Sequence, residues 1–100
     1  MTGAEQWLRG RIDGAPEALV ESMIAALPEA APTVPGALVG GALKLYAEVA
    51  RGSGGREDAL PLLAADALFT HAFEAQAELD PAGISELVER CRRELGEVLS

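Results

Sequence analysis

The chain has few of the residues from which catalytic, metal and disulfide sites are built. Its 100 residues include one cysteine, one histidine and only four aromatic residues. The single cysteine, Cys91, excludes an internal disulfide and a cysteine-rich zinc site. One histidine supplies only one imidazole ligand to a metal. We therefore expect neither a metal nor a cofactor.

Basic residues and long apolar runs are also scarce. Eight Lys and Arg stand against sixteen Asp and Glu, giving a net charge of −8, which disfavours nucleic acids and anionic membrane surfaces as partners. The longest apolar stretch, 59–73, contains Asp66 and His71 and is too short to cross a bilayer. The first eleven residues are polar and do not resemble a secretion signal, so we expect a cytoplasmic protein.

Hydrophobic residues and alanine, in contrast, are abundant. Hydrophobic residues make up 49% of the chain, and nineteen of them are alanine, the best helix former. This composition resembles that of GC-rich bacterial genomes. No stretch alternates apolar and polar residues, whereas helical spacing recurs five times. The sequence predicts one all-α domain over residues 1–100, a compact bundle of four main helices preceded by a short N-terminal helix.

Proline and glycine mark the boundaries between the five segments. The expected helices cover about 4–12, 16–27, 35–51, 58–79 and 81 onward. In the third, Gly36, Gly40 and Gly41 each cost about 1 kcal/mol relative to alanine, which indicates close packing against a neighbour. The fourth is apolar nearly all round and is expected to be the central helix.

The fifth segment carries a heptad-like apolar seam, and its outer face is expected to carry the ion pairs Glu86–Arg90, Glu89–Arg93 and, in reversed order, Arg93–Glu97. The seam has spacings of four, three, four and three and consists of Ile84, Val88, Cys91, Leu95 and Val98. Its thiol has no histidine nearby in sequence to activate it, so we interpret Cys91 as structural.

One polar stripe interrupts the fourth segment. It consists of Asp66, Thr70, Glu74 and Glu78 at four-residue intervals, with His71 beside it. Carboxylates beside a histidine are suited to proton transfer or to metal binding. Di-iron bundles, however, need a Glu-x-x-His order on two helices and two further glutamates, and this chain has His-x-x-Glu once. We interpret the stripe as the solvated edge of the helix, with no metal bound.

Two short segments resemble known helical enzymes. Leu8 to Asp13 resembles the opening of the helical chorismate mutases, which implies a long cationic first helix, but this chain breaks at Gly14 and Pro16. Leu63 to Glu74 resembles a helix of the trans-polyprenyl synthases, which bind magnesium-diphosphate through aspartate-rich motifs that this chain lacks. Neither resemblance assigns a family or a catalytic residue.

The sequence favours a non-enzymatic interaction or regulatory module. We expect a homodimer, formed through the glycine face at Gly36 and Gly40 or through the seam of the fifth helix. The alternative is a small helical enzyme or ligand-binding protein with a polar site at Asp66, His71 and Glu74. The two alternatives differ in whether this stripe faces solvent or an enclosed cavity.

Overall fold

The computed structural model describes residues 2–99, and every regular element within this range is helical. Helices account for 79% of the described residues, which confirms the predicted all-α class. The five α-helices are α1 (Gly3–Arg9), α2 (Glu17–Ala26), α3 (Val34–Ala50), α4 (Ala59–Leu79) and α5 (Ile84–Leu99). Two short 3₁₀ turns, η1 (Arg56–Asp58) and η2 (Pro81–Gly83), precede α4 and α5.

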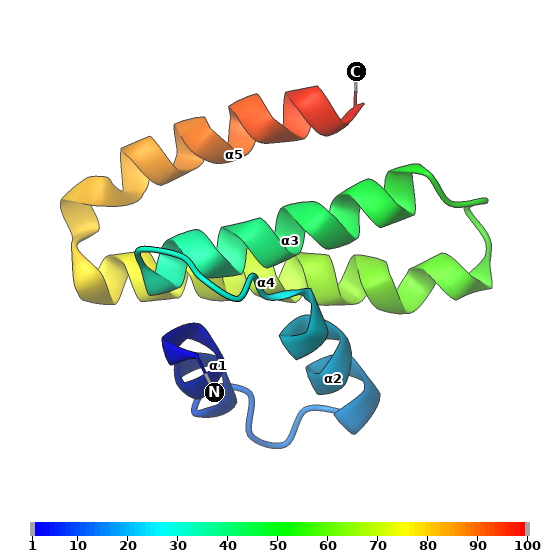
Figure 1. Ribbon diagram of the computed structural model, residues 1–100, viewed down its shortest axis with the longest axis horizontal. Helices are drawn as coiled ribbons and strands as arrows, with labels where there is room; N and C mark the ends of the chain where they lie inside the picture. The colour runs from blue at the N-terminus through cyan, green and yellow to red at the C-terminus, as the bar shows by residue number, and fades with distance from the viewer. Residues whose placement is uncertain (1, 100) are drawn as a thin grey trace.

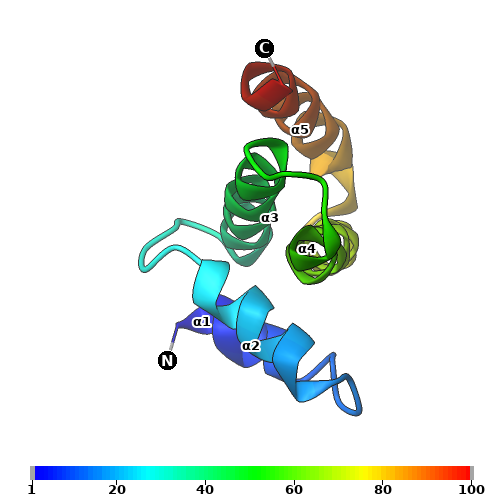
Figure 2. The same ribbon diagram turned by 90° about the vertical axis from the view of Figure 1, so that its right-hand side faces the viewer.

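The helices form three layers (Figures 1 and 2). The antiparallel pair α3 and α4 forms the middle layer and makes the most extensive contact in the molecule. The short helices α1 and α2 cover one side of this pair, and α5 alone covers the opposite side. An outer layer made of one helix leaves more of its own surface open than a layer made of two.

The core is built mainly from small residues, as the alanine content predicts. Eight of its seventeen buried hydrophobic residues are alanines. The largest fully buried side chains are those of Leu8, Met23, Leu38, Leu68, Val39 and Pro35. A Cβ atom on Gly41 would lie 3.2 Å from Leu68 Cδ1 and 3.3 Å from the Ala26 carbonyl oxygen. The close packing expected around the α3 glycines is therefore present at Gly41, where the end of α2 meets α3.

Helix α4 is central, as predicted, but it shares the middle layer with α3. Helix α3 carries eight buried residues and α4 carries five, because α3 lies between the α1/α2 layer and α5. The first turns of α4 leave Leu60, Leu62 and Leu63 exposed. Periodicity counts apolar residues on a helix, but it does not show how many neighbours are available to cover them.

Local hydrogen bonds set the helix ends. The Thr33 hydroxyl oxygen accepts the Gly36 amide at the start of α3, and the Asp80 carboxylate accepts the Ala82 amide before α5. Helix α3 ends at its C-cap residue Arg51, whose amide donates to the Ala47 carbonyl oxygen. Two hydrogen bonds restrain the loop that follows. The Ser53 hydroxyl donates to the Glu57 carboxylate at 2.5 Å, and the Gly54 amide donates to the Asp58 carboxylate at 2.7 Å.

Candidate functional site

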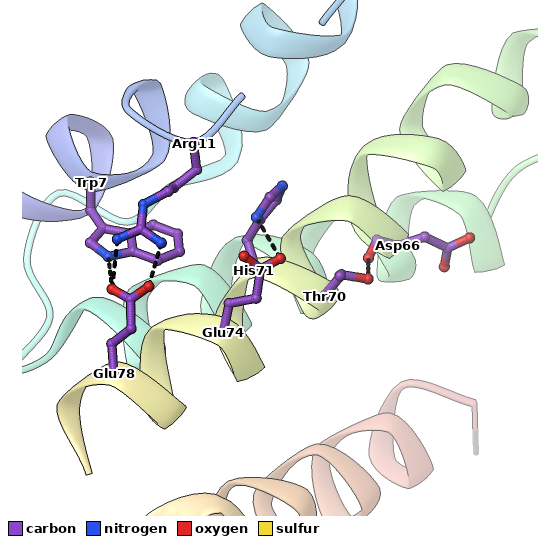
Figure 3. Close-up of polar contacts among 7 residues, drawn as sticks. All are labelled: Trp7, Arg11, Asp66, Thr70, His71, Glu74 and Glu78. Carbon is purple, nitrogen blue, oxygen red and sulfur yellow. Dashed lines mark hydrogen bonds and ion pairs between the residues drawn. The ribbon is translucent and has the colours of Figure 1, made fainter. Parts of the chain in front are cut away.

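The polar stripe of α4 lies on the surface. Asp66, Thr70, Glu74 and Glu78 are all exposed side chains. The Thr70 hydroxyl donates to the Asp66 carbonyl oxygen at 3.0 Å, which is the usual bond of a threonine to the preceding turn of its own helix (Figure 3). This arrangement holds no carboxylate in a desolvated position, so it supports the interpretation of the stripe as a solvated edge.

His71 lies between the stripe and α1. Its side chain is 18% exposed, and its ring meets the Trp7 ring edge-on at 6.1 Å between centroids. Nδ1 lies 3.2 Å from Glu74 Oε1, which allows an ion pair when the imidazole is protonated. The geometry does not form a hydrogen bond, and this buried nitrogen has no hydrogen-bonding partner among the described residues. Of the three residues of the alternative site, only His71 and Glu74 come together, and Asp66 contacts neither in Figure 3.

A second polar cluster joins α1 to α4 and was not predicted. Glu78 accepts hydrogen bonds from both terminal nitrogens of Arg11, the Nη2 bond being 2.7 Å long, and from Trp7 Nε1 at 3.3 Å. The Arg11 guanidinium carbon also lies 4.5 Å from the centroid of the Trp7 ring, within the range of a cation–π contact (Figure 3). Because these partners are more than sixty residues apart in sequence, no local pattern pairs them.

This cluster has a defined electrostatic effect. Hydrogen bonding from Arg11, with a smaller contribution from Trp7, holds the pKa of Glu78 below its ordinary value. The same contact with Glu78 raises the pKa of Arg11. A general acid or base needs a pKa moved towards neutrality, and the shift of Glu78 goes the other way. The cluster is therefore suited to fixing α1 on α4 rather than to proton transfer.

The remaining candidates for chemistry are isolated. Burial raises the pKa of the Cys91 thiol, which disfavours the nucleophilic thiolate. Within residues 2–99, no group of three or more His, Cys, Asp or Glu side chains is placed to hold a metal ion. None of the helices described here is long and apolar enough to span a bilayer.

The glycine face of α3 already has neighbours inside the chain. A Cβ atom on Gly40 would contact Pro28 Cγ at 3.5 Å, and one on Gly36 would lie near the Thr33 hydroxyl and the Arg90 guanidinium. Arg90 Nη1 also donates to the Gly36 carbonyl oxygen at 3.2 Å. Residues 27–33, the connector between α2 and α3, and helix α5 thus occupy the space over these two glycines.

The seam of α5 is only partly covered. Cys91 is the one buried residue of the seam, and Ile84, Leu95 and Val98 are half-buried. Leu87, beside the seam, is also buried. Val88 is 37% exposed and Leu99 is 66% exposed. Helix α5 is also more strongly amphipathic than α2, α3 or α4. The apolar side of α5 therefore extends beyond the area that α3 and α4 cover.

Two of the ion pairs expected along α5, Glu86–Arg90 and Glu89–Arg93, are replaced by others. Arg90 Nε bonds Glu94 at 2.5 Å, and Arg92 Nη1 lies 3.5 Å from Glu89. Arg90 points away from Glu86, because its Nη1 donates to the Gly36 carbonyl oxygen near the start of α3. The spacing along α5 therefore predicted that arginines pair with glutamates of the same helix, but it did not predict which glutamate each arginine contacts.

Comparison with protein-family models, with curated proteins and with solved structures gives no match to this chain. Any statement about its function therefore depends on its own residues.

Proposed function

We propose that this chain is a non-enzymatic interaction module that self-associates as a homodimer through α5. The observation that carries the proposal is the partly uncovered apolar face of this outer helix. Val88, Leu95 and Leu99 are spaced seven and four residues apart and so lie on one side of α5, which we call the α5 face. Exposed apolar patches on small proteins commonly mark contact surfaces.

Charge supports a second copy as the occupant. Helix α5 carries three of the eight basic residues and four acidic residues, so it contributes −1 to a net charge of −8. Two α5 helices that meet therefore bring little net charge of the same sign together.

Gly96 supports the same surface. It lies within α5, and a Cβ atom there would meet no other atom within 4 Å. A glycine inside a helix costs about 0.5–1 kcal/mol relative to alanine, and no internal neighbour of Gly96 requires its small size. Beside the α5 face, it leaves room for another helix to approach closely.

The size of this face sets the expected affinity. A sixteen-residue helix is about 24 Å long and about 10 Å wide. The area of such a face is small compared with the roughly 800 Å² that each partner buries in a stable complex. We therefore expect a weak homodimer that forms at micromolar concentrations. A cytoplasmic location is part of the proposal, and the single buried thiol, which has no disulfide partner in the chain, is compatible with it.

The test is light scattering on a double variant, Val88→Glu with Leu99→Glu. Leu95 is unsuitable because it packs against the core. Both chosen side chains are exposed, so the variant is expected to fold and to remain monomeric where the wild type dimerises. Leu99→Glu alone, at the last helical residue, serves if the double variant fails to fold.

Leu63→Glu is the matched control. Leu63 lies on α4 and is 59% exposed, close to the value of Leu99, so its variant is expected to dimerise like the wild type. A Leu63→Glu variant that becomes monomeric while the α5 variant dimerises would move the contact to α4 and contradict the proposal.

A further inference from the structure

A separate apolar cleft lies between α1, the start of α3 and the end of α4. Its volume is about 400 Å³, within the range of small-molecule sites. Its apolar walls are formed by Trp7, Pro32, Val34, Pro35, Ala75 and Leu79. No residue of α5 lines it, so it is distinct from the surface proposed for self-association.

The walls of this cleft are held in place before any ligand enters. Trp7 is fixed on one side by its hydrogen bond to Glu78 and by the Arg11 guanidinium at 4.5 Å (Figure 3). On the other side, Pro32 in the connector and Pro35 in the first turn of α3 have fixed φ angles, which restrict the backbone there. A rigid site loses little conformational freedom on binding.

Leu79 leaves apolar surface for a ligand to cover. It is the last residue of α4, it lines the cleft, and it is 61% exposed. The leucines of the core are buried, whereas most of the Leu79 side chain is left uncovered by the described residues.

The charges at the cleft favour an uncharged ligand. Glu78 is the one charged residue in its lining, and Arg11 already pairs with it. A charged ligand would lose its hydration without gaining a free counter-charge. The other polar group is the Thr33 hydroxyl, whose oxygen accepts the Gly36 amide and whose hydrogen can be donated to a ligand.

We propose that this cleft binds an uncharged small molecule with an aromatic or branched apolar group. Such a group would contact the apolar lining to which Trp7 and Leu79 contribute, and an acceptor atom on it can take the Thr33 hydroxyl hydrogen.

The experiment uses N-phenylnaphthylamine, an uncharged aromatic probe, and the intrinsic fluorescence of Trp7, the only tryptophan in the chain. Titration is expected to saturate at one probe per chain and to quench Trp7 emission. A carboxylate placed in the apolar cleft by Leu79→Glu is expected to weaken binding by about tenfold or more. Leu79→Gln is the second variant if Leu79→Glu does not fold by circular dichroism.

Three controls define failure. Leu63→Glu, on the same helix and equally exposed, is expected to leave probe affinity unchanged, and so is the Val88→Glu/Leu99→Glu variant. Anilinonaphthalene sulfonate, a similar but anionic probe, is expected to bind more weakly. The proposal is overturned if Leu79→Glu binds like the wild type, if saturation leaves Trp7 emission unchanged, if Leu63→Glu loses binding equally, or if the anionic probe binds more tightly. None of these outcomes depends on dimerisation.

Discussion

Two adjacent glycines of α3 have different surroundings, and this difference predicts opposite effects of alanine. At Gly40 an added Cβ would make an ordinary contact with Pro28 at 3.5 Å. Gly40→Ala is therefore expected to stabilise the fold by about 0.5–1 kcal/mol through helix propensity. The measurement is the free energy of unfolding in urea.

Gly41→Ala is the matched comparison. Its Cβ would lie 3.2–3.3 Å from Leu68, from Leu27 and from the Ala26 carbonyl oxygen, and these atoms belong to packed elements that move little. Overpacking of this kind costs about 1–3 kcal/mol, which exceeds the gain in propensity. We expect Gly41→Ala to be less stable than the wild type, and a stabilised Gly41→Ala would contradict the packing described for α2 and α3.

The contact of Arg11 with Glu78 predicts a pH dependence of stability. The pKa of Glu78 is lowered in the folded chain from an ordinary value of 4.5, so the contact stabilises the fold above that pH. Its contribution is lost as the pH falls through the lowered pKa. The difference in melting temperature between wild type and Glu78→Gln is therefore expected to be largest near neutrality and to shrink below pH 4.5.

The control for this titration is Glu29→Gln, at an exposed position in the connector. Its melting temperature is expected to follow that of the wild type throughout. A Glu78→Gln variant whose deficit stays constant down to strongly acidic pH would show that the carboxylate acts by shape and not by charge.

At the scale of elements, the start of the last helical segment depends on one side chain. The Asp80 carboxylate accepts the Ala82 amide at 3.1 Å, and Pro81 follows it. Asp80→Ala is expected to lower the free energy of unfolding by about 0.5–2 kcal/mol, and Asp80→Asn to restore most of it. Asp66→Ala, in the exposed middle of α4, is expected to change stability by less than about 0.5 kcal/mol. Equal effects at the two aspartates would argue against the cap.

The helices were predictable because their signals are local. Proline near a helix start, Asp80 before Pro81 and the apolar spacing of α5 are all read within a few residues. The contacts between helices were less predictable, because they depend on geometry. The pairing of Arg11 and Trp7 with Glu78 joins distant segments, and Arg90 turns towards α3 instead of Glu86.

The candidate site follows the same division. The residues of the polar stripe were identified from their spacing, but the placement of His71 beneath Trp7 depends on how α1 docks. The apolar cleft combines three segments that are far apart in sequence, so no motif predicts it. The seam of α5 was recognised, whereas its partial exposure depends on how few helices lie beside it.

At the scale of the whole molecule, the layered arrangement leaves one side of the α3/α4 pair to a single amphipathic helix (Figure 2). Two copies with a net charge of −8 repel each other at long range. The screening length falls from about 10 Å at 0.1 M salt to about 3 Å at 1 M. The homodimer is therefore expected to become tighter as salt rises, as measured by light scattering. Dissociation by salt would show instead that ion pairs hold the two copies together.

The most direct measurement is sedimentation equilibrium of the wild-type chain over a range of micromolar concentrations. The average mass is expected to rise with concentration from 10.4 kDa towards twice that value. The Val88→Glu/Leu99→Glu variant is expected to stay at 10.4 kDa under the same conditions. A wild-type mass of 10.4 kDa at every concentration would contradict self-association through α5.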